Sequence, residues 1–175
     1  MRAVLLCVVT FVLAALTAHA QRSQDPLTPD QEEQVRNVAD QPNDRVKLFI
    51  TFIEQRTAAI HQAVVRPETQ HPSVEIHDEL TAFTSLVDEL QDNLDAYDES
   101  HSDIRKALKF LLEHTAKWPA VLQQPPGSPE YDFARKSALD SVETTTQAAT
   151  ELLKSQEEYF SKHKPEKAAK KSPDE

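Results

Sequence analysis

The sequence predicts an all-α fold, an antiparallel up-down-up-down four-helix bundle with a short extra N-terminal helix. The 175-residue chain contains a single glycine, and the Asn-Gly and Asp-Gly pairs that mark β-hairpins do not occur in it. Apolar residues repeat at alternating spacings of three and four over long stretches. Capping residues and prolines divide these stretches into one short and four long helices, and the short connections favour antiparallel neighbours.

An export signal is predicted at residues 1–20. Arg2 precedes a run of small and apolar residues at 3–16, which is too short and too close to the terminus to favour a permanent transmembrane helix. Ala18 and Ala20 place small side chains ahead of a cleavage point before residue 21. We therefore expect an exported protein, periplasmic or extracellular, that is not attached to a membrane after cleavage.

Cys7 is the only cysteine and lies inside the apolar run, after Leu6, where it makes a poor site for lipoprotein acylation. The mature chain should therefore contain no cysteine and form no disulfide, thiolate metal site or covalent haem linkage. Its stability must come from core packing, for which about 155 residues are enough.

The first two helices are expected at about residues 29–39 and 43–65. Thr28 is the expected N-cap of the first helix, a proline occupies its first turn, and Gln31 completes a capping box. In the second helix, six of the eight residues at 46–53 are apolar, so this helix should be the most buried element.

The third helix is expected to follow the break at residues 71–73 and to continue to about Asp98. The fourth should start near Ser100 and stop or kink at Trp118-Pro119, because proline cannot donate the helical hydrogen bond. The apolar seam of the third helix consists of Ile76, Leu80, Phe83, Val87, Leu90, Leu94 and Tyr97. That of the fourth consists of Ile104, Leu108, Leu111, Thr115 and Trp118.

A proline-rich connection at 124–127 precedes the fifth helix. Ser128 is its expected cap, Pro129 opens it, and it can continue to about His163. Its seam is weaker and consists of Ala138, Val142, Thr145, Ala149, Leu152 and Tyr159. The seams together predict one core in a single domain at residues 21–163. Its central members should be Phe49, Ile53, Ile60, Phe83, Leu90, Leu108, Leu111 and Val142.

The charge distribution argues against nucleic acid and anionic membranes as partners of the domain. The chain has a formal net charge of −10 at pH 7, and an acidic body repels both kinds of anionic surface. Residues 164–175 instead form a Lys-rich segment with prolines and no large apolar residue, which predicts a disordered tail. The simpler interpretation is that this tail rests loosely on the acidic body, and the alternative is a dedicated binding arm.

No Lys or Arg occurs between Arg66 and Arg105, whereas Asp and Glu are frequent there. Within the acidic region 67–104, this pattern is typical either of a solvated polar face or of a surface for cations or a basic partner. The possible oxygen ligands for calcium are Asp92, Asp95, Asp98, Glu99 and Asp103. However, no twelve-residue loop follows the EF-hand pattern, and no histidine has a ligand partner at helical spacing. We therefore predict no metal and no cofactor.

Enzymatic activity is not predicted, and no catalytic residue is assigned. One glycine cannot build the phosphate-binding loops of P-loop or dinucleotide-binding proteins. Ser, His and Asp are present, but no strand-to-helix nucleophile elbow or glycine-built oxyanion turn accompanies them.

Residues 27–31, Leu-Thr-Pro-Asp-Gln, resemble the LTxxQ motif of periplasmic helical stress chaperones. The resemblance implies an exported chaperone, which agrees with the predicted signal. The second copy of the motif that this family would have is missing, because Leu80-Thr81 is followed by Phe83 and Thr84 rather than by Gln.

The sequence therefore predicts a non-enzymatic interaction or scaffold protein that binds a protein partner or self-associates. A chaperone is the alternative, and a metal or calcium binder is the third possibility. The fifth helix, at about 35 residues and roughly 52 Å, should overhang shorter neighbours. Its candidate interaction surface is centred on Tyr159 and Phe160. The simpler expectation is that the first helix packs over these two aromatic side chains.

Overall fold

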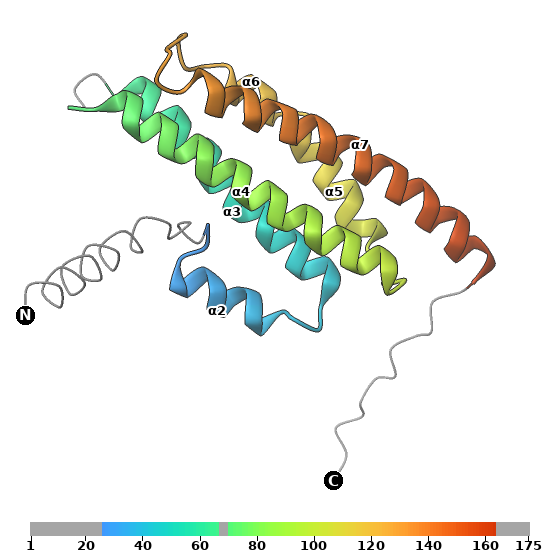
Figure 1. The fold of residues 1–175 in the computed structure, drawn as a ribbon. Coiled ribbons are helices and arrows are strands. Elements are labelled where there is room, and N and C mark those ends of the chain that lie inside the picture. The colour runs from blue at the N-terminus through green and yellow to red at the C-terminus, as the bar shows by residue number, and fades with distance from the viewer. Residues whose placement is uncertain (1–25, 67–69, 164–175) are drawn as a thin grey trace, which may run out of the picture.

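The computed structural model describes residues 26–66 and 70–163 (Figure 1). All regular secondary structure in that part of the chain is α-helical, and five of the helices pack together. The predicted export signal and the predicted tail at 164–175 lie outside the described residues. The helices are α2 (Pro29–Asn37), α3 (Pro42–Val65), α4 (Pro72–Glu99), α5 (Arg105–Thr115), α6 (Trp118–Leu122) and α7 (Asp132–Lys162).

The predicted capping box at the start of α2 is confirmed. The Gln31 amide donates to Thr28 Oγ1 at 3.3 Å, and the Thr28 amide donates to Gln31 Oε1 at 2.9 Å. The Gln31 side chain also donates to Gln55 Oε1 on α3 at 3.1 Å, while Leu27 and Val35 are buried. The start of α2 is therefore hydrogen-bonded to α3, and Leu27 and Val35 join the hydrophobic core.

The predicted seam of α4 and the predicted deep burial of α3 are confirmed. Six of the seven seam residues of α4 are buried, from Ile76 to Leu94, and Tyr97 packs partly buried against them. More residues are buried in α3 than in any other described helix. Every predicted core residue belongs to one contiguous cluster, namely Phe49, Ile53, Ile60, Phe83, Leu90, Leu108, Leu111 and Val142.

The fourth long helix begins later than the sequence suggests, at Arg105 rather than near Ser100. His101 has a φ of 53°, a left-handed conformation that an α-helix cannot include. The Ser100 hydroxyl donates to the Tyr97 carbonyl instead of capping a new helix. Asp103 accepts from the Arg105 amide and guanidinium, so the polar contact at the helix start comes from this carboxylate.

The predicted interruption at Trp118-Pro119 is confirmed, because α5 ends at Thr115 and the short helix α6 begins at Trp118. Pro119 has no amide hydrogen to donate to the carbonyl four residues earlier. Trp118 is nevertheless buried, with its ring 5.7 Å from that of Phe83 in an edge-to-face arrangement. The break therefore changes the course of the chain without leaving the core.

The last helix also starts later than predicted, at Asp132 rather than at Pro129. Asp132 accepts from the Ser128 amide at 3.0 Å, and the Glu130 amide donates to Ser128 Oγ at 3.3 Å. These bonds hold residues 128–131 in a turn ahead of the helix. The buried Tyr131 hydroxyl donates to the Pro126 carbonyl and fixes the turn to the proline-rich connection.

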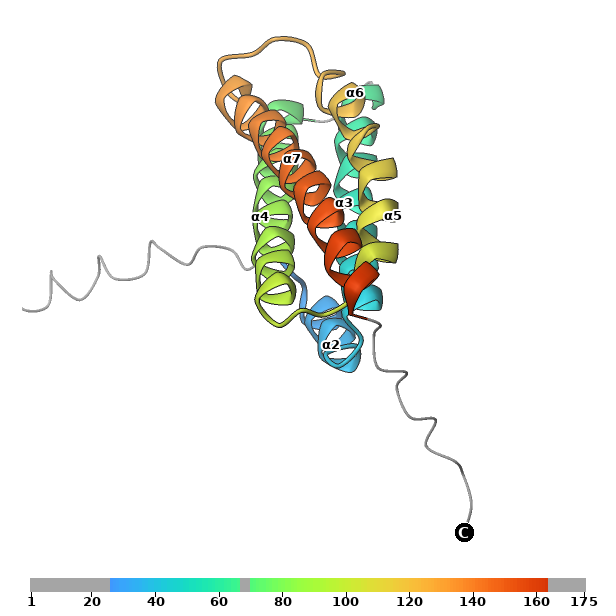
Figure 2. The same cartoon turned by 90° about the vertical axis from the view of Figure 1, so that its right-hand side faces the viewer.

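Consecutive helices are not always neighbours. The most extensively packed pairs are α3 with α4, α4 with α7, α5 with α7, and α3 with α5, as Figure 2 shows. The Asn43 side chain at the start of α3 bonds to Asp103 and Ala107 beside the start of α5, so these two helices run parallel. The expectation of antiparallel neighbours holds for α3 with α4 and for α5 with α7. It is wrong for α4 and α5, which are joined by a short link yet lie across the molecule from each other.

No helix among residues 26–66 and 70–163 has the length and apolar character needed to cross a membrane.

Candidate functional site

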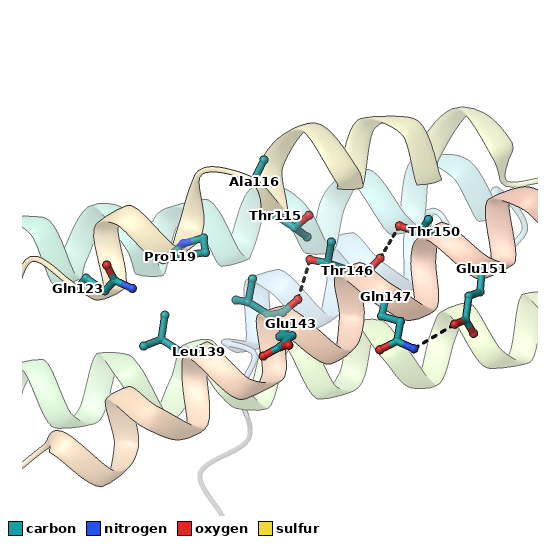
Figure 3. Close-up of a pocket in the computed structure, with 11 residues that line it drawn as sticks. Thr115, Ala116, Pro119, Gln123, Leu139, Glu143, Thr146, Gln147, Thr150 and Glu151 are labelled. Atoms are coloured by element: carbon teal, nitrogen blue, oxygen red, sulfur yellow. Dashed lines mark hydrogen bonds between the residues drawn. The ribbon is translucent and has the colours of Figure 1, made fainter.

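An open groove of about 720 Å³ lies where α5 gives way to α6 and both face α7 (Figure 3). It is called the α6–α7 groove below. Its apolar lining comes from Ala116, Pro119, Leu139 and Val142. Its polar lining comes from Thr115, Gln123, Glu143, Thr146, Gln147, Thr150 and Glu151. A volume of this order is typical of sites that bind ligands or side chains of a partner.

Small side chains from both walls lie at the helix break and leave the groove open. On one side, the chain between α5 and α6 presents Ala116, and Pro119 follows one turn later. On the other side, α7 presents Thr146 and Thr150 one turn apart. None of these side chains is long enough to close the space between the walls, so the interior remains open to solvent.

The threonine hydroxyls in the groove donate to the backbone of their own helices. Thr115 donates to the Leu112 carbonyl at 3.3 Å, Thr146 to the Val142 carbonyl at 2.7 Å, and Thr150 to the Thr146 carbonyl at 2.7 Å. Each hydroxyl hydrogen is therefore already used. What these residues offer to an occupant is a methyl group and an acceptor oxygen.

Two carboxylates, Glu143 and Glu151, lie on the α7 side of the groove and are exposed. Glu151 accepts from the Gln147 side chain at 3.0 Å. Neither glutamate forms an ion pair with a Lys or Arg of the described residues, and no Lys or Arg lines the groove. The groove therefore combines an apolar floor with an uncompensated negative rim.

The predicted interaction surface, Tyr159 and Phe160, lies in the last turns of α7. The Tyr159 ring stacks between the rings of His101 and His163, with centroids 4.7 Å and 4.4 Å away. The Phe160 ring lies edge-on to Tyr159 at 5.0 Å, and the Arg105 guanidinium is 4.8 Å from its centroid. Both aromatic side chains are half-buried.

The contacts of these two aromatics come from the start of α5 and the chain before it, through His101 and Arg105. The first helix, which was expected to cover them, is instead tied to α3 by the bond from Gln31 to Gln55. Beside them, the buried Gln156 accepts from the Ile104 amide at 3.1 Å and donates to the Ser102 carbonyl at 3.0 Å. The end of α7 is thus held against the chain that leads into α5, and binding by Tyr159 and Phe160 stays a prediction.

The possible calcium ligands of the acidic region do not converge. In the part of the chain that the structure describes, no three His, Cys, Asp or Glu side chains lie where they could hold a metal ion. Asp95 accepts from Gln91 at 2.8 Å. The Arg105 guanidinium, which hydrogen-bonds to Asp103, holds the pKa of that carboxyl below its ordinary value. Asp92, Asp98 and Glu99 remain on the exposed surface of α4.

Sequence reasoning missed a polar link between α3 and the break before α6. Glu54 Oε1 accepts from Trp118 Nε1 at 2.7 Å and lies 2.7 Å from His114 Nδ1. Glu54 and His114 are 60 positions apart in the chain, so no local pattern pairs them. The link holds the buried Trp118 and the end of α5 against α3, so its contribution is to the stability of the fold.

Comparisons with family models, with curated proteins and with solved structures give no match to this chain. The short resemblance at residues 27–31 therefore has no wider similarity behind it, and these residues act in the structure as the capped start of α2.

Proposed function

We propose that this chain is an exported, non-enzymatic interaction module that binds a partner protein in the α6–α7 groove. The observation that carries the proposal is the groove itself, which is open and predominantly apolar and whose lining contains no His, Cys, Lys or Arg. The export signal expected at residues 1–20 supplies the proposed location, periplasmic or extracellular.

We also propose that the fold is an up-down-up-down four-helix bundle in which α5 and α6 together form the third helix. The packing of α3 with α4 and of α5 with α7, each pair running in opposite directions in Figure 1, supports this arrangement. The groove then lies at the one place where a bundle helix is interrupted, beside the weakest apolar seam of the sequence.

Two other functions can be separated from this proposal by simple measurements. A chaperone of the LTxxQ type would suppress the aggregation of client proteins at substoichiometric to equal ratios. A calcium-binding protein would melt at a higher temperature with calcium, since a hundredfold excess over the dissociation constant contributes about 2.7 kcal/mol.

The proposed function is tested by filling the groove and measuring partner capture. Thr146→Phe places a large ring between the two walls, and the matched control Thr81→Phe places the same ring on the exposed surface of α4. Protein immobilised on beads is exposed to the exported fraction of its source, and captured proteins are quantified. We expect a partner that wild type and Thr81→Phe capture and Thr146→Phe loses.

The competing surface is tested in the same assay with Tyr159→Ser combined with Phe160→Ser. Loss of capture in this double variant, with full capture by Thr146→Phe and unchanged helicity in both proteins, would move the binding site to the end of α7 and contradict the groove proposal.

A further inference from the structure

We infer that the occupant of the α6–α7 groove is an amphipathic helix of the partner, with an apolar face and with Lys or Arg on its flanks. The inference rests on the proposed function and adds the chemistry of the partner to it. Three features of the groove carry it: the length of its floor, the shortage of free hydrogen-bond donors, and the unpaired carboxylates.

The length of the groove suits a short helical segment. On α7 the lining residues run from Leu139 to Glu151, which corresponds to about 18 Å at 1.5 Å per residue. This distance is roughly three turns of a bound helix, and such a helix would place apolar side chains at spacings of three and four along the floor. Leu139, Val142 and Pro119 provide the apolar surface that these side chains would cover.

The hydrogen-bonding character of the lining favours a helix over an extended peptide. An extended segment would bring its own carbonyl groups against the groove, and each buried carbonyl needs a donor. The hydroxyls of Thr115, Thr146 and Thr150 already donate to their own helices, and the amides of α7 are used within that helix. The side-chain amides of Gln123 and Gln147 are the remaining donors of the lining, which is too few for the backbone of an extended segment that runs the length of the groove. A helical occupant forms its backbone hydrogen bonds internally and needs no donor from the groove.

The charge of the rim selects basic flanks. Glu143 and Glu151 lie eight residues apart, which is about 12 Å or roughly two turns along α7. Both are exposed, and neither has an ion-pair partner among the described residues. Lys or Arg spaced by two turns on a bound helix would meet both carboxylates, whereas an acidic helix would be repelled.

The test uses three fluorescent peptides of about fourteen residues with the same leucine face. Their flanking positions carry Lys in the first, Gln in the second and Glu in the third. Affinity for the purified protein is measured by fluorescence anisotropy at low and high salt, and helix formation by circular dichroism. We expect the Lys peptide to bind best and the Glu peptide worst, and added salt to weaken only the Lys peptide.

Protein variants separate the floor of the groove from its rim. Glu143→Gln combined with Glu151→Gln should weaken the Lys peptide by on the order of tenfold and leave the Gln peptide unchanged. The control Glu33→Gln combined with Glu130→Gln removes the same charge from exposed positions outside the groove and should change neither. Thr146→Phe should abolish binding of the Lys and Gln peptides alike.

Different failures point to different errors. Equal binding of all three peptides that Thr146→Phe abolishes would contradict the basic partner and leave the proposed function standing. The inference would be overturned if Thr146→Phe did not change the affinity for the Lys peptide. It would also be overturned if the two double Glu→Gln variants lowered that affinity equally, because the peptide would then be attracted to the acidic body as a whole. If no peptide binds although partner capture depends on Thr146, the inference fails alone. If capture does not depend on Thr146 either, the proposed function fails with it.

Discussion

The hairpin of α3 and α4 and the hairpin of α5, α6 and α7 close their seams to different degrees. In the first, large side chains such as Phe49, Ile53, Phe83 and Leu90 are fully buried. In the second, α7 contributes the small Ala138, Thr145 and Ala149 to the core, and its partner helix is interrupted. The two hairpins are similar in length but differ in the size of their core side chains. Large side chains fill the space between two helices, whereas small ones leave a groove.

The two hairpins are expected to contribute differently to stability and to binding. The first hairpin supplies 14 of the 27 buried hydrophobic residues in the described part of the chain, and buried apolar surface is the main source of stability. The second hairpin carries the open groove, several of whose lining residues are exposed. Variants should therefore have opposite effects in the two places, with large losses of stability in the first and losses of binding in the second.

The largest expected effect breaks the first hairpin. Phe83→Ala should lower the free energy of unfolding by about 3–5 kcal/mol, because it removes a fully buried ring and leaves a cavity beside Trp118. The matched change Phe133→Ala affects a ring that is 83% exposed at the start of α7, and it should stay within about 0.5 kcal/mol of wild type. Urea unfolding measures both, and similar losses in the two proteins would contradict the comparison.

The next effect concerns the link between the two hairpins. Glu54→Ala should cost about 1–3 kcal/mol, because the buried indole of Trp118 loses the acceptor that Glu54 provides. Glu113→Ala, at an exposed neighbouring position of α5, is the control and should cost little. Thermal unfolding would show the difference, and an unchanged melting temperature for Glu54→Ala would mean that the link does not stabilise the break.

A smaller effect is expected at the start of α2, outside both hairpins. Thr28→Ala removes the acceptor for the Gln31 amide and should cost about 0.5–2 kcal/mol, while Thr28→Ser should retain most of the stability. Hydrogen exchange of the α2 amides is the measurement. Protection that is the same in Thr28→Ala and wild type would mean that Leu27 and Val35 hold α2 in place without the cap.

The smallest effect depends on pH and sharpens the account of how α5 begins. Because the hydrogen bond from Arg105 lowers the pKa of folded Asp103, its contribution is complete above the unfolded pKa of about 3.9 and is lost as the pH falls through the folded pKa. Asp103→Asn should therefore be less stable than wild type at pH 7, by under about 1 kcal/mol. The difference in unfolding free energy between the two proteins should disappear at strongly acidic pH. Denaturant titrations measure it across this pH range, and a difference that does not change with pH would contradict a role for the Asp103–Arg105 pair.

The sequence predicted the helices and the core far better than it predicted the groove. The apolar seam of α4 and the apolar character of α3 can be predicted because each depends on residues close together in one helix. The later starts at Arg105 and Asp132 were missed because a left-handed His101 and a turn held by Asp132 depend on backbone conformation rather than on capping signals.

The groove could not be predicted because it depends on which helices face each other. Periodicity places Thr146 and Thr150 beside the weak seam of α7, but only the packing of α5 and α6 against that face shows that no large side chain fills the space. The same applies to Glu54 and His114, which meet across two helices. The length of the last helix and its large apolar residues near the end indicate Tyr159 and Phe160, but nothing local in the sequence indicates their contacts with His101 and Arg105.

The most direct test of the central claim is to locate the residues that respond to a bound basic helix. Methyl NMR spectra of the protein are recorded with and without the Lys-flanked peptide, and resonances of Leu139, Val142 and Thr146 report on the groove. We predict shifts of these methyl groups that saturate with peptide concentration, with little change at Leu80 and Leu90 in the sealed hairpin. Shifts confined to residues around Tyr159 and Phe160, with the groove methyls unchanged, would contradict the account.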